Sequence, residues 1–283
     1  MARPAAKYKA PPAPTGPAPA SRRKRATPSS GSAPEHVERN RAAWERWAPG
    51  FEPAARRAWK DEELRWGIWG LAESELQLLT SLELDTDVVE LGCGTATVSA
   101  WLARHGARPV AVDFARAQID AVGRLQLAFG VPFRTVCGNA EKLEFDDESF
   151  DLAISEYGVS LWSEPDRWLP EAHRLLRPGG RLIFVTNSAF LMACTPSTGG
   201  RAEEALVRDY FSMAKVEFDE EDAAEFHPTH GEWVRALVAA HFVLEDLIEV
   251  RPPPNAVARF DFASLDWARS WPSEEIWVAR KAG

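Results

Sequence analysis

Short apolar runs alternate with longer segments of helical character through the middle of this chain. The apolar runs lie at residues 87–91, 109–113, 133–137, 150–155 and 181–186, and the helical segments lie at 97–105, 115–129 and 165–176. Each helical segment is followed by glycine, at Gly106, at Gly130 or in the Arg-Pro-Gly-Gly turn 177–180, as is common at helix C-termini. This alternation predicts a parallel sheet with helices on both faces. Ligands bind such sheets beyond the carboxyl ends of the strands.

An N-terminal helical cap is predicted at residues 35–84. The pattern there is helical in pieces, with breaks at Pro49-Gly50 and Pro53. Five of the twelve tryptophans fall within 26 residues of this segment: Trp44, Trp47, Trp59, Trp66 and Trp69. Trp44 and Trp47 are three residues apart and therefore share one helical face. These rings can pack the cap onto the sheet domain or form an aromatic wall for a ligand, and the two interpretations are compatible.

Residues 1–34 are predicted to be a disordered, basic tail. They contain eight prolines, nine alanines, seven Lys or Arg and no acid, a composition that cannot bury a core. Its SRRKR cluster can touch an acidic partner or nucleic acid, although a solubilising role is the simpler interpretation. The composition also allows a transit peptide, but the prolines disrupt the amphipathic helix that one needs.

Charge and composition narrow the class of protein. The net charge of the 283 residues is −9, and residues 35–283 carry 26 bases against 42 acids, a charge of −16. Such a body repels phosphate, which argues against a large nucleic-acid interface. No apolar run approaches the ~18 residues of a membrane span. The cysteines Cys93, Cys137 and Cys194 are scattered without metal-site spacing, which suits a reducing cytoplasm.

A glycine turn directly after the first predicted strand is the main candidate for a binding site. It reads Glu90-Leu91-Gly92-Cys93-Gly94-Thr95-Ala96. The dinucleotide fingerprint G-x-G-x-x-G fails at Thr97, and no Gly-Lys-Ser/Thr of a phosphate loop is present. The Glu90 carboxylate would repel a pyrophosphate but can receive an ammonium group. The turn therefore favours a cofactor with a cationic end.

In these motifs the chain resembles class I S-adenosylmethionine-dependent methyltransferases, over roughly Asp85 to Arg280. The family signature E/D-x-G-x-G-x-G ends here in Ala96 instead of glycine. The resemblance implies a Rossmann-like, seven-stranded, mostly parallel sheet, with 242–250 and 274–283 as an antiparallel edge. It further implies a methyltransferase core at 85–283 with a substrate-side insertion at 187–240. We expect helices at 201–215 and 231–240 within that insertion.

The resemblance also implies a set of cofactor-binding residues. They are Glu90, Gly92, Cys93 and Gly94 at the turn, Asp113 for the ribose hydroxyls, Phe114, Asn139, Ala140 and Glu141 around the adenine, and Glu156 for the methionine ammonium group. Asn139 replaces the acid that accepts from the adenine amino group in the family, and its amide oxygen can still accept.

The acceptor side is less defined. Transfer from a sulfonium needs alignment and exclusion of water, and a base only if the acceptor arrives protonated. Glu156 and His230 are candidates for that base, so the catalytic residue stays open. The candidate substrate pocket comprises Tyr157, Trp162, Trp66, Trp69 and His230, all of which can instead be packing residues. His227 and His230 have the spacing of metal ligands, but Pro228 and the lack of a third ligand argue against a metal.

We therefore expect a cytoplasmic methyltransferase that uses S-adenosylmethionine and a small-molecule acceptor. One alternative is a nucleic-acid (tRNA) methyltransferase, although the N/D-P-P-Y motif for base amino groups is absent. Another is a non-catalytic regulator that binds S-adenosylmethionine. A nicotinamide-dependent dehydrogenase is disfavoured by Glu90 and Thr97.

Overall fold

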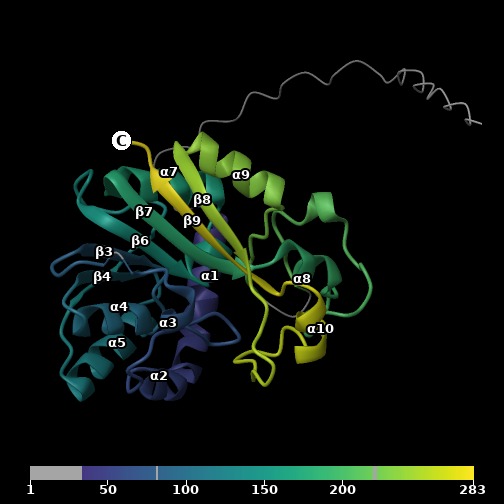
Figure 1. The fold of residues 1–283 in the computed structure, drawn as a ribbon, viewed down its shortest axis with the longest axis horizontal. Coiled ribbons are helices and arrows are strands. Elements are labelled where there is room, and N and C mark those ends of the chain that lie inside the picture. Colours follow the sequence, from purple (N-terminus) through teal and green to yellow (C-terminus); the bar gives the residue numbers. More distant parts are fainter. Residues whose placement is uncertain (1–33, 81, 219–221) are drawn as a thin grey trace, which may run out of the picture. The chain divides into compact units, whose positions relative to one another are not determined.

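Seven strands form the central sheet of the computed structural model, which describes residues 34–80, 82–218 and 222–283 (Figure 1). Their order across the sheet is β5-β4-β3-β6-β7-β9-β8. The strands are β3 (Asp87–Leu91), β4 (Arg108–Asp113), β5 (Arg134–Cys137), β6 (Phe150–Glu156), β7 (Leu176–Asn187), β8 (Phe242–Glu249) and β9 (Glu274–Lys281). Strands β3 to β7 pair in parallel, whereas β9 is antiparallel to both β7 and β8. The predicted mostly parallel sheet with an antiparallel edge is confirmed.

Helices cover both faces of this sheet, as the alternating pattern predicted. Helices α4 (Thr97–Arg104) and α5 (Arg116–Phe129) lie on one side in Figure 1, and α7 (Pro165–Leu175) and α9 (His230–Ala239) lie on the other. Adjacent residues of β3 show why: Val88 packs in a cluster with Leu102 of α4, and Val89 packs in a cluster with Leu169 of α7. Successive side chains of a strand point to opposite faces, so a strand covered on both sides is apolar throughout.

The predicted cap consists of short elements that belong to the same compact unit as the sheet. They are α1 (Glu35–Trp47), the 3-10 turn η1 (Ala48–Gly50), α2 (Glu52–Ala58), the hairpin strands β1 (Arg65–Trp66) and β2 (Leu71–Ala72), and α3 (Glu73–Leu76). The break between α1 and α2 occurs at Pro49-Gly50, as predicted. The break predicted at Pro53 is wrong, because Pro53 lies in the first turn of α2, where its missing N–H is not needed.

Two side chains of α1 hold the cap over the carboxyl ends of the strands. The buried Asn40 amide donates to the carbonyl oxygens of Trp162 (2.9 Å) and Ala224 (2.8 Å) and accepts from the Ala224 N–H (2.7 Å). The Glu45 carboxylate accepts from the first two backbone N–H groups of α5, at 2.7 and 3.0 Å. A carboxylate at a helix N-terminus pairs with its free N–H groups and its positive dipole end. The cap is therefore fixed to the loops that follow β4 and β6.

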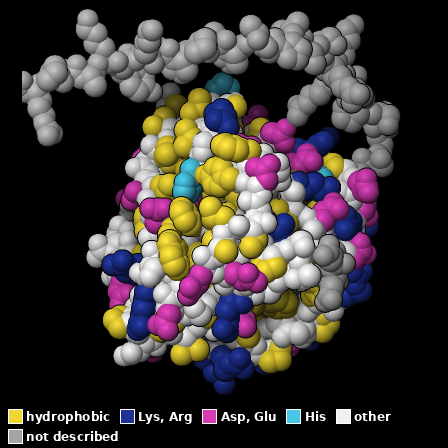
Figure 2. Space-filling view, turned by 90° about the vertical axis from the view of Figure 1, so that its right-hand side faces the viewer, with side chains coloured by type: hydrophobic (Ala, Val, Ile, Leu, Met, Phe, Trp, Pro, Cys, Tyr) yellow, Lys and Arg dark blue, Asp and Glu magenta, His cyan; other side chains and the backbone are white. Residues whose placement is uncertain are grey.

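The helix expected at 201–215 is not formed, and that prediction is wrong. Only the 3-10 turn η2 (Tyr210–Ser212) occurs there, because the backbone bonds to other segments: the Ala202 N–H donates to Phe262 O (2.8 Å) and the Val207 N–H to Ala193 O (2.7 Å). Three short helices were missed: α6 (Val159–Trp162), α8 (Ala189–Cys194) and α10 (Leu265–Ser270). Figure 2 looks onto the side where α8 and α10 lie in Figure 1 and shows hydrophobic side chains gathered between charged ones.

The predicted tail, with its SRRKR cluster, lies outside the described residues except for Pro34. Among the helices of the described ranges, none combines the length and the apolar character needed to cross a membrane.

Candidate active site

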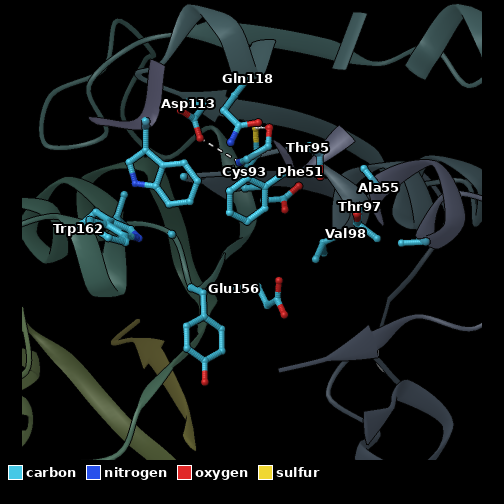
Figure 3. Close-up of a pocket in the computed structure, with 18 of the residues that line it drawn as sticks. Phe51, Ala55, Cys93, Thr95, Thr97, Val98, Asp113, Gln118, Glu156 and Trp162 are labelled. Carbon is cyan, nitrogen blue, oxygen red and sulfur yellow. Dashed lines mark hydrogen bonds between the residues drawn. The ribbon is translucent and has the colours of Figure 1, made fainter. Parts of the chain in front are cut away.

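A cavity of about 720 Å³ opens at the carboxyl ends of β3, β4 and β6 (Figure 3). Its walls come from the glycine turn after β3, the residues that end β4 and β6, the cap, and the loop before α10. This volume is in the range of small-molecule sites, and its position is where open α/β sheets bind ligands.

The glycine turn has the backbone shape that its sequence suggested. Gly92 and Gly94 have φ values of +71° and +52°, and Ala96 also adopts a left-handed φ of +52°. A side chain at Gly92 would meet the backbone of Gly158, whose Cα would lie 2.7 Å from the added carbon. Trp59 of the cap donates its indole N–H to the Thr95 carbonyl (3.0 Å) and fixes the turn from outside.

Glu90 lies at the centre of the site and is 3% exposed. Its Oε2 accepts from the backbone N–H (2.9 Å) and the hydroxyl (2.5 Å) of Ser99, in the first turn of α4. Burial, together with repulsion from the carboxylates of Glu156 and Asp113, raises the pKa of Glu90 to about 8. A cation placed beside it would therefore favour its ionised form.

Asp113 ends β4 and points into the same cavity (Figure 3). Its Oδ2 accepts from the Gly94 N–H (2.9 Å) and its Oδ1 from the Ala115 N–H (2.8 Å). Burial raises the pKa of Asp113 to about 6. Asp113 thus stabilises both the glycine turn and the start of α5, and each carboxylate oxygen keeps a lone pair for a ligand.

Glu156 is the third carboxylate of the cavity and ends β6. It accepts from the backbone N–H of Gly67 (3.0 Å), and the Arg259 guanidinium lies 4.0 Å away. Burial raises the pKa of Glu156. Tyr157 follows with a left-handed φ of +53° and also lines the cavity.

Aromatic rings form the opposite wall. Trp44 of α1 packs edge-to-face on Trp162, with ring centroids 5.3 Å apart, and Phe51 packs 5.3 Å from Trp44. Phe260 extends the wall from the loop before α10, 6.3 Å from Phe51. One side of the cavity is therefore acidic and the other is flat and apolar (Figure 3).

Most residues predicted from the sequence meet in this one cavity. Besides Glu90, Asp113 and Glu156, the cavity is lined by Gly92, Cys93, Gly94, Phe114, Asn139, Ala140, Tyr157 and Trp162. Glu141 does not line it, because its carboxylate lies 2.5 Å from His36 Nε2 of α1.

Three residues predicted for the substrate pocket lie elsewhere. Trp66 and Trp69 are core residues, 0% and 5% exposed, whose indole N–H groups donate to Glu73 and Ser273. They are buried there because the β1–β2 hairpin packs against the sheet. His230 begins α9, and its Nε2 lies 2.5 Å from the Glu275 carboxylate, outside the cavity.

Sequence reasoning missed several lining residues, among them Phe51, Gln118, Arg259 and Phe260. Gln118 lies in the first turn of α5, is 1% exposed, and its Oε1 has no hydrogen-bond partner. No motif identifies Gln118 as a binding residue. Its position in the first turn of the helix that follows Asp113 could have indicated that it faces the same site. Arg259 and Phe260 reach the cavity only through the fold of a distant loop.

Comparisons with known proteins agree with this geometry. Residues 89–184 match the family model of a methyltransferase domain. A demethylmenaquinone methyltransferase of Clavibacter sepedonicus is 41% identical over 97 residues, which cover 34% of this chain and 39% of that relative. The chain thus matches about two fifths of the length of this curated relative.

Solved structures resemble a larger part of the chain. An S-adenosylmethionine-dependent methyltransferase from Mesorhizobium loti has a TM-score of 0.58 at 23% identity and covers 76% of this chain and 100% of its own. A second similar structure is a Burkholderia thailandensis 1,6-didemethyltoxoflavin-N1-methyltransferase, solved with 1,6-didemethyltoxoflavin and S-adenosylhomocysteine. It has a TM-score of 0.55 at 18% identity, and the match covers 91% of this chain and 94% of that one. At these identities the likeness establishes the fold.

Proposed function

We propose that this chain, which carries a methyltransferase domain of the class I S-adenosylmethionine-dependent type, transfers a methyl group from that cofactor to a small organic acceptor. One observation carries the proposal: the buried carboxylates of Glu90 and Asp113 and the partly exposed carboxylate of Glu156 converge on one cavity beside a glycine turn. Carboxylates crowded in a low dielectric stabilise a cation strongly, and they repel phosphate-rich cofactors.

The residues present fit the cofactor in charge and in space. The space beside Gly92 is filled by the Gly158 backbone, whereas a carbon added to Gly94 would meet only the Gln118 amide nitrogen, at 4.0 Å, so a ligand can lie on the turn at Gly94. The free Oε1 of Gln118 offers an acceptor for a hydroxyl or amino group. We assign the ribose hydroxyls to Asp113, the adenine to Phe114, Asn139 and Ala140, and the ammonium group to Glu90 or Glu156.

When bound, S-adenosylmethionine supplies a methyl group on a sulfonium sulfur, which is a good leaving group. The chain then has to align the acceptor and exclude water. Trp44 and Phe51 of the cap serve this purpose, because they line the cavity and because the hydrogen bonds of Asn40 and Glu45 hold α1 in place. The aromatic wall favours a flat, largely apolar acceptor.

A small acceptor is also supported by charge and by the relatives. The charge of −16 over residues 35–283 disfavours a nucleic-acid substrate. The names of two similar proteins, the demethylmenaquinone and the 1,6-didemethyltoxoflavin-N1-methyltransferase, refer to small cyclic molecules.

Titration calorimetry with S-adenosylmethionine tests the cofactor site. Hydrogen bonds to a charged group contribute about 1.5–3 kcal/mol, so Asp113→Ala should weaken binding roughly ten- to a hundredfold. Asp113→Asn, which keeps the shape and one acceptor, should lose less. Asp120→Ala is the matched control, because Asp120 is an exposed residue of the following helix α5, and this variant should bind as the parent does. A parent that does not bind at millimolar cofactor would overturn the proposal.

A further inference from the structure

Tyr157 is held where the reacting atoms of a methyl transfer would meet. It directly follows β6, and Gly158 after it packs on Gly92 of the glycine turn. A left-handed φ of +53° at a bulky residue costs about 1–2 kcal/mol and persists only where the surroundings impose it. Tyr157 lines the cavity, and its hydroxyl donates to Glu274 Oε2 (2.8 Å).

Glu274 is the first residue of β9 and is 0% exposed. Its Oε2 also accepts from the backbone N–H of Ile68 (2.7 Å), in the β1–β2 hairpin. A side chain at Gly67 would collide with this carboxylate, so the hairpin leaves space for it. Two separate segments of the chain therefore position the carboxylate on the Tyr157 hydroxyl.

The hydrogen bonds of Glu274 fix the β1–β2 hairpin to β9, but they use only one of its two carboxylate oxygens. Among the described residues, no Lys, Arg or His forms an ion pair with Glu274, and its Oε1 has no hydrogen-bond partner. Burying a carboxylate without a cationic partner costs several kcal/mol, which these hydrogen bonds offset in part. Burial, with repulsion from Glu156, raises the pKa of Glu274 to about 7, where it can gain and lose a proton near neutral pH.

We propose that Tyr157 and Glu274 form a proton relay and that the acceptor is an aromatic hydroxyl compound. This inference rests on the proposed methyl transfer. Tyr157 is the catalytic residue, since its oxygen accepts the hydrogen bond of the acceptor hydroxyl. Glu274 is a positioning residue that acts through Tyr157 and takes up the proton.

The step balances as follows. The acceptor oxygen forms a bond to the methyl carbon as the carbon–sulfur bond breaks and the sulfur keeps the electron pair. The acceptor proton moves to the Tyr157 oxygen while the Tyr157 proton moves to Glu274, whose carboxylate becomes a neutral carboxyl group. After the methyl ether leaves, the proton returns through Tyr157 to water in the cavity.

The cavity favours a phenol over an amine as acceptor. Four acidic residues line it, Asp61, Glu90, Asp113 and Glu156, and they keep an aliphatic amine protonated and non-nucleophilic. A phenol enters uncharged, packs against the wall that Trp44, Phe51 and Trp162 form, and becomes a nucleophile only on losing its proton. Two arginines also line the cavity, Arg57 and Arg259. The Arg259 guanidinium lies 4.0 Å from Glu156, and among the described residues neither arginine forms an ion pair with Glu274.

The first test needs neither cofactor nor acceptor. Infrared spectroscopy of the protein should show a protonated carboxyl band that titrates near pH 7 and is missing in Glu274→Gln. Tyr157→Phe should move this titration to higher pH, because the hydroxyl stabilises the ionised form. Glu275→Gln is the matched control, since Glu275 is equally buried on β9 but bonds to His230 and Trp277. A band that is unchanged in Glu274→Gln, or unmoved in Tyr157→Phe, would overturn the relay.

The second test measures methyl transfer to phenol and catechol as probes. The carboxylate is the active form, so kcat of the parent should rise with pH through about 7 and then level off. Glu274→Gln and Tyr157→Phe should each lower kcat about 10²–10⁴-fold and lose this pH dependence. The double variant should have a kcat little lower than either single variant, because the two residues act as one unit. Glu275→Gln should have the kcat and the pH dependence of the parent.

Calorimetry with S-adenosylmethionine separates the proton relay from the proposed methyltransferase function. We expect the parent and the variants of Tyr157, Glu274 and Glu275 to bind the cofactor with similar affinity, since Glu274 lies outside the cavity wall. A parent that binds the cofactor but methylates neither phenol would overturn the relay and the acceptor class while leaving the proposed function intact. Variants that retain the pH profile of the parent would overturn the relay alone.

Discussion

The backbones of Gly92 and Gly158 touch, and a carbon added to Gly92 would lie 2.7 Å from the Gly158 Cα. This contact joins the end of β3 to the end of β6. It sets how closely the proposed cofactor turn approaches Tyr157, the residue at which we place the acceptor.

Gly92→Ala should therefore destabilise the protein more than backbone strain alone does. A left-handed φ costs a non-glycine residue about 1–2 kcal/mol, and the collision at Gly92 should add about 1–3 kcal/mol. Gly130→Ala is the control, because Gly130 has a similar φ of +66° with nothing within 4 Å of the added carbon. Urea denaturation of both variants measures the difference, and equal losses would contradict the contact.

Stability should fall as the pH rises, in the absence of cofactor. The pKa values of Glu90, Glu274 and Asp113 are raised to about 8, 7 and 6, so the folded protein binds these protons more tightly than the unfolded chain does. Stability from a raised pKa is fully present below the unfolded value, near 4 for these groups, and is lost as pH rises through the folded value. We expect the melting temperature to decline between about pH 5 and 8.

Glu90→Gln should flatten the upper part of that decline, because Glu90 has the highest of the three pKa values. The exposed Glu144→Gln should leave the curve of the parent unchanged. Melting temperatures from calorimetry at several pH values check both expectations. A Glu90→Gln curve parallel to that of the parent would mean that Glu90 titrates normally.

Most of the sheet and one side of the site could be predicted from local sequence. Strands β3, β4 and β6 are apolar runs buried on both faces, and Asp113 and Glu156 end two of them, so the parallel order alone brings both to one edge. The acceptor side depends on contacts between distant segments. Phe260 is positioned by a loop more than 200 residues away from Phe51.

The wrong predictions for the substrate pocket also arise from contacts between distant segments. Trp66 and Trp69 are part of the same aromatic-rich segment as Trp44, but the β1–β2 hairpin directs them into the core, where Glu73 and Ser273 accept their N–H groups. The periodicity of a sequence does not show on which side of such a hairpin a ring will pack. The contact between Glu274 and Tyr157 could not be predicted either, since only the fold brings β9 to Tyr157.

Gln118→Met should separate ligand binding from stability. The buried Oε1 of Gln118 has no hydrogen-bond partner among the described residues, so removing it should leave the free energy of unfolding unchanged or slightly increase it. If that oxygen accepts a hydrogen bond from the cofactor, binding of S-adenosylmethionine should weaken by about 0.5–1.5 kcal/mol, up to roughly tenfold. Thermal melts and titration calorimetry on one preparation measure both quantities. Loss of stability without loss of affinity would show that Gln118 is a packing residue.

The affinity for S-adenosylmethionine should rise with pH more steeply than the affinity for S-adenosylhomocysteine. The two ligands share an ammonium and a carboxylate group, so the titration of these groups cancels in the comparison. They differ by the positive charge of the sulfonium, which binds best when the neighbouring carboxylates are ionised. Glu90 has a pKa raised to about 8, and a cation beside it should lower that pKa and release a proton on binding.

Calorimetry between pH 6 and 9, in buffers of different ionisation enthalpy, counts the protons released. We expect the ratio of the two affinities to increase over this range in the parent and to increase less in Glu90→Gln. A constant ratio in the parent would place the sulfonium away from the three carboxylates and would contradict the charge argument on which the proposed function rests.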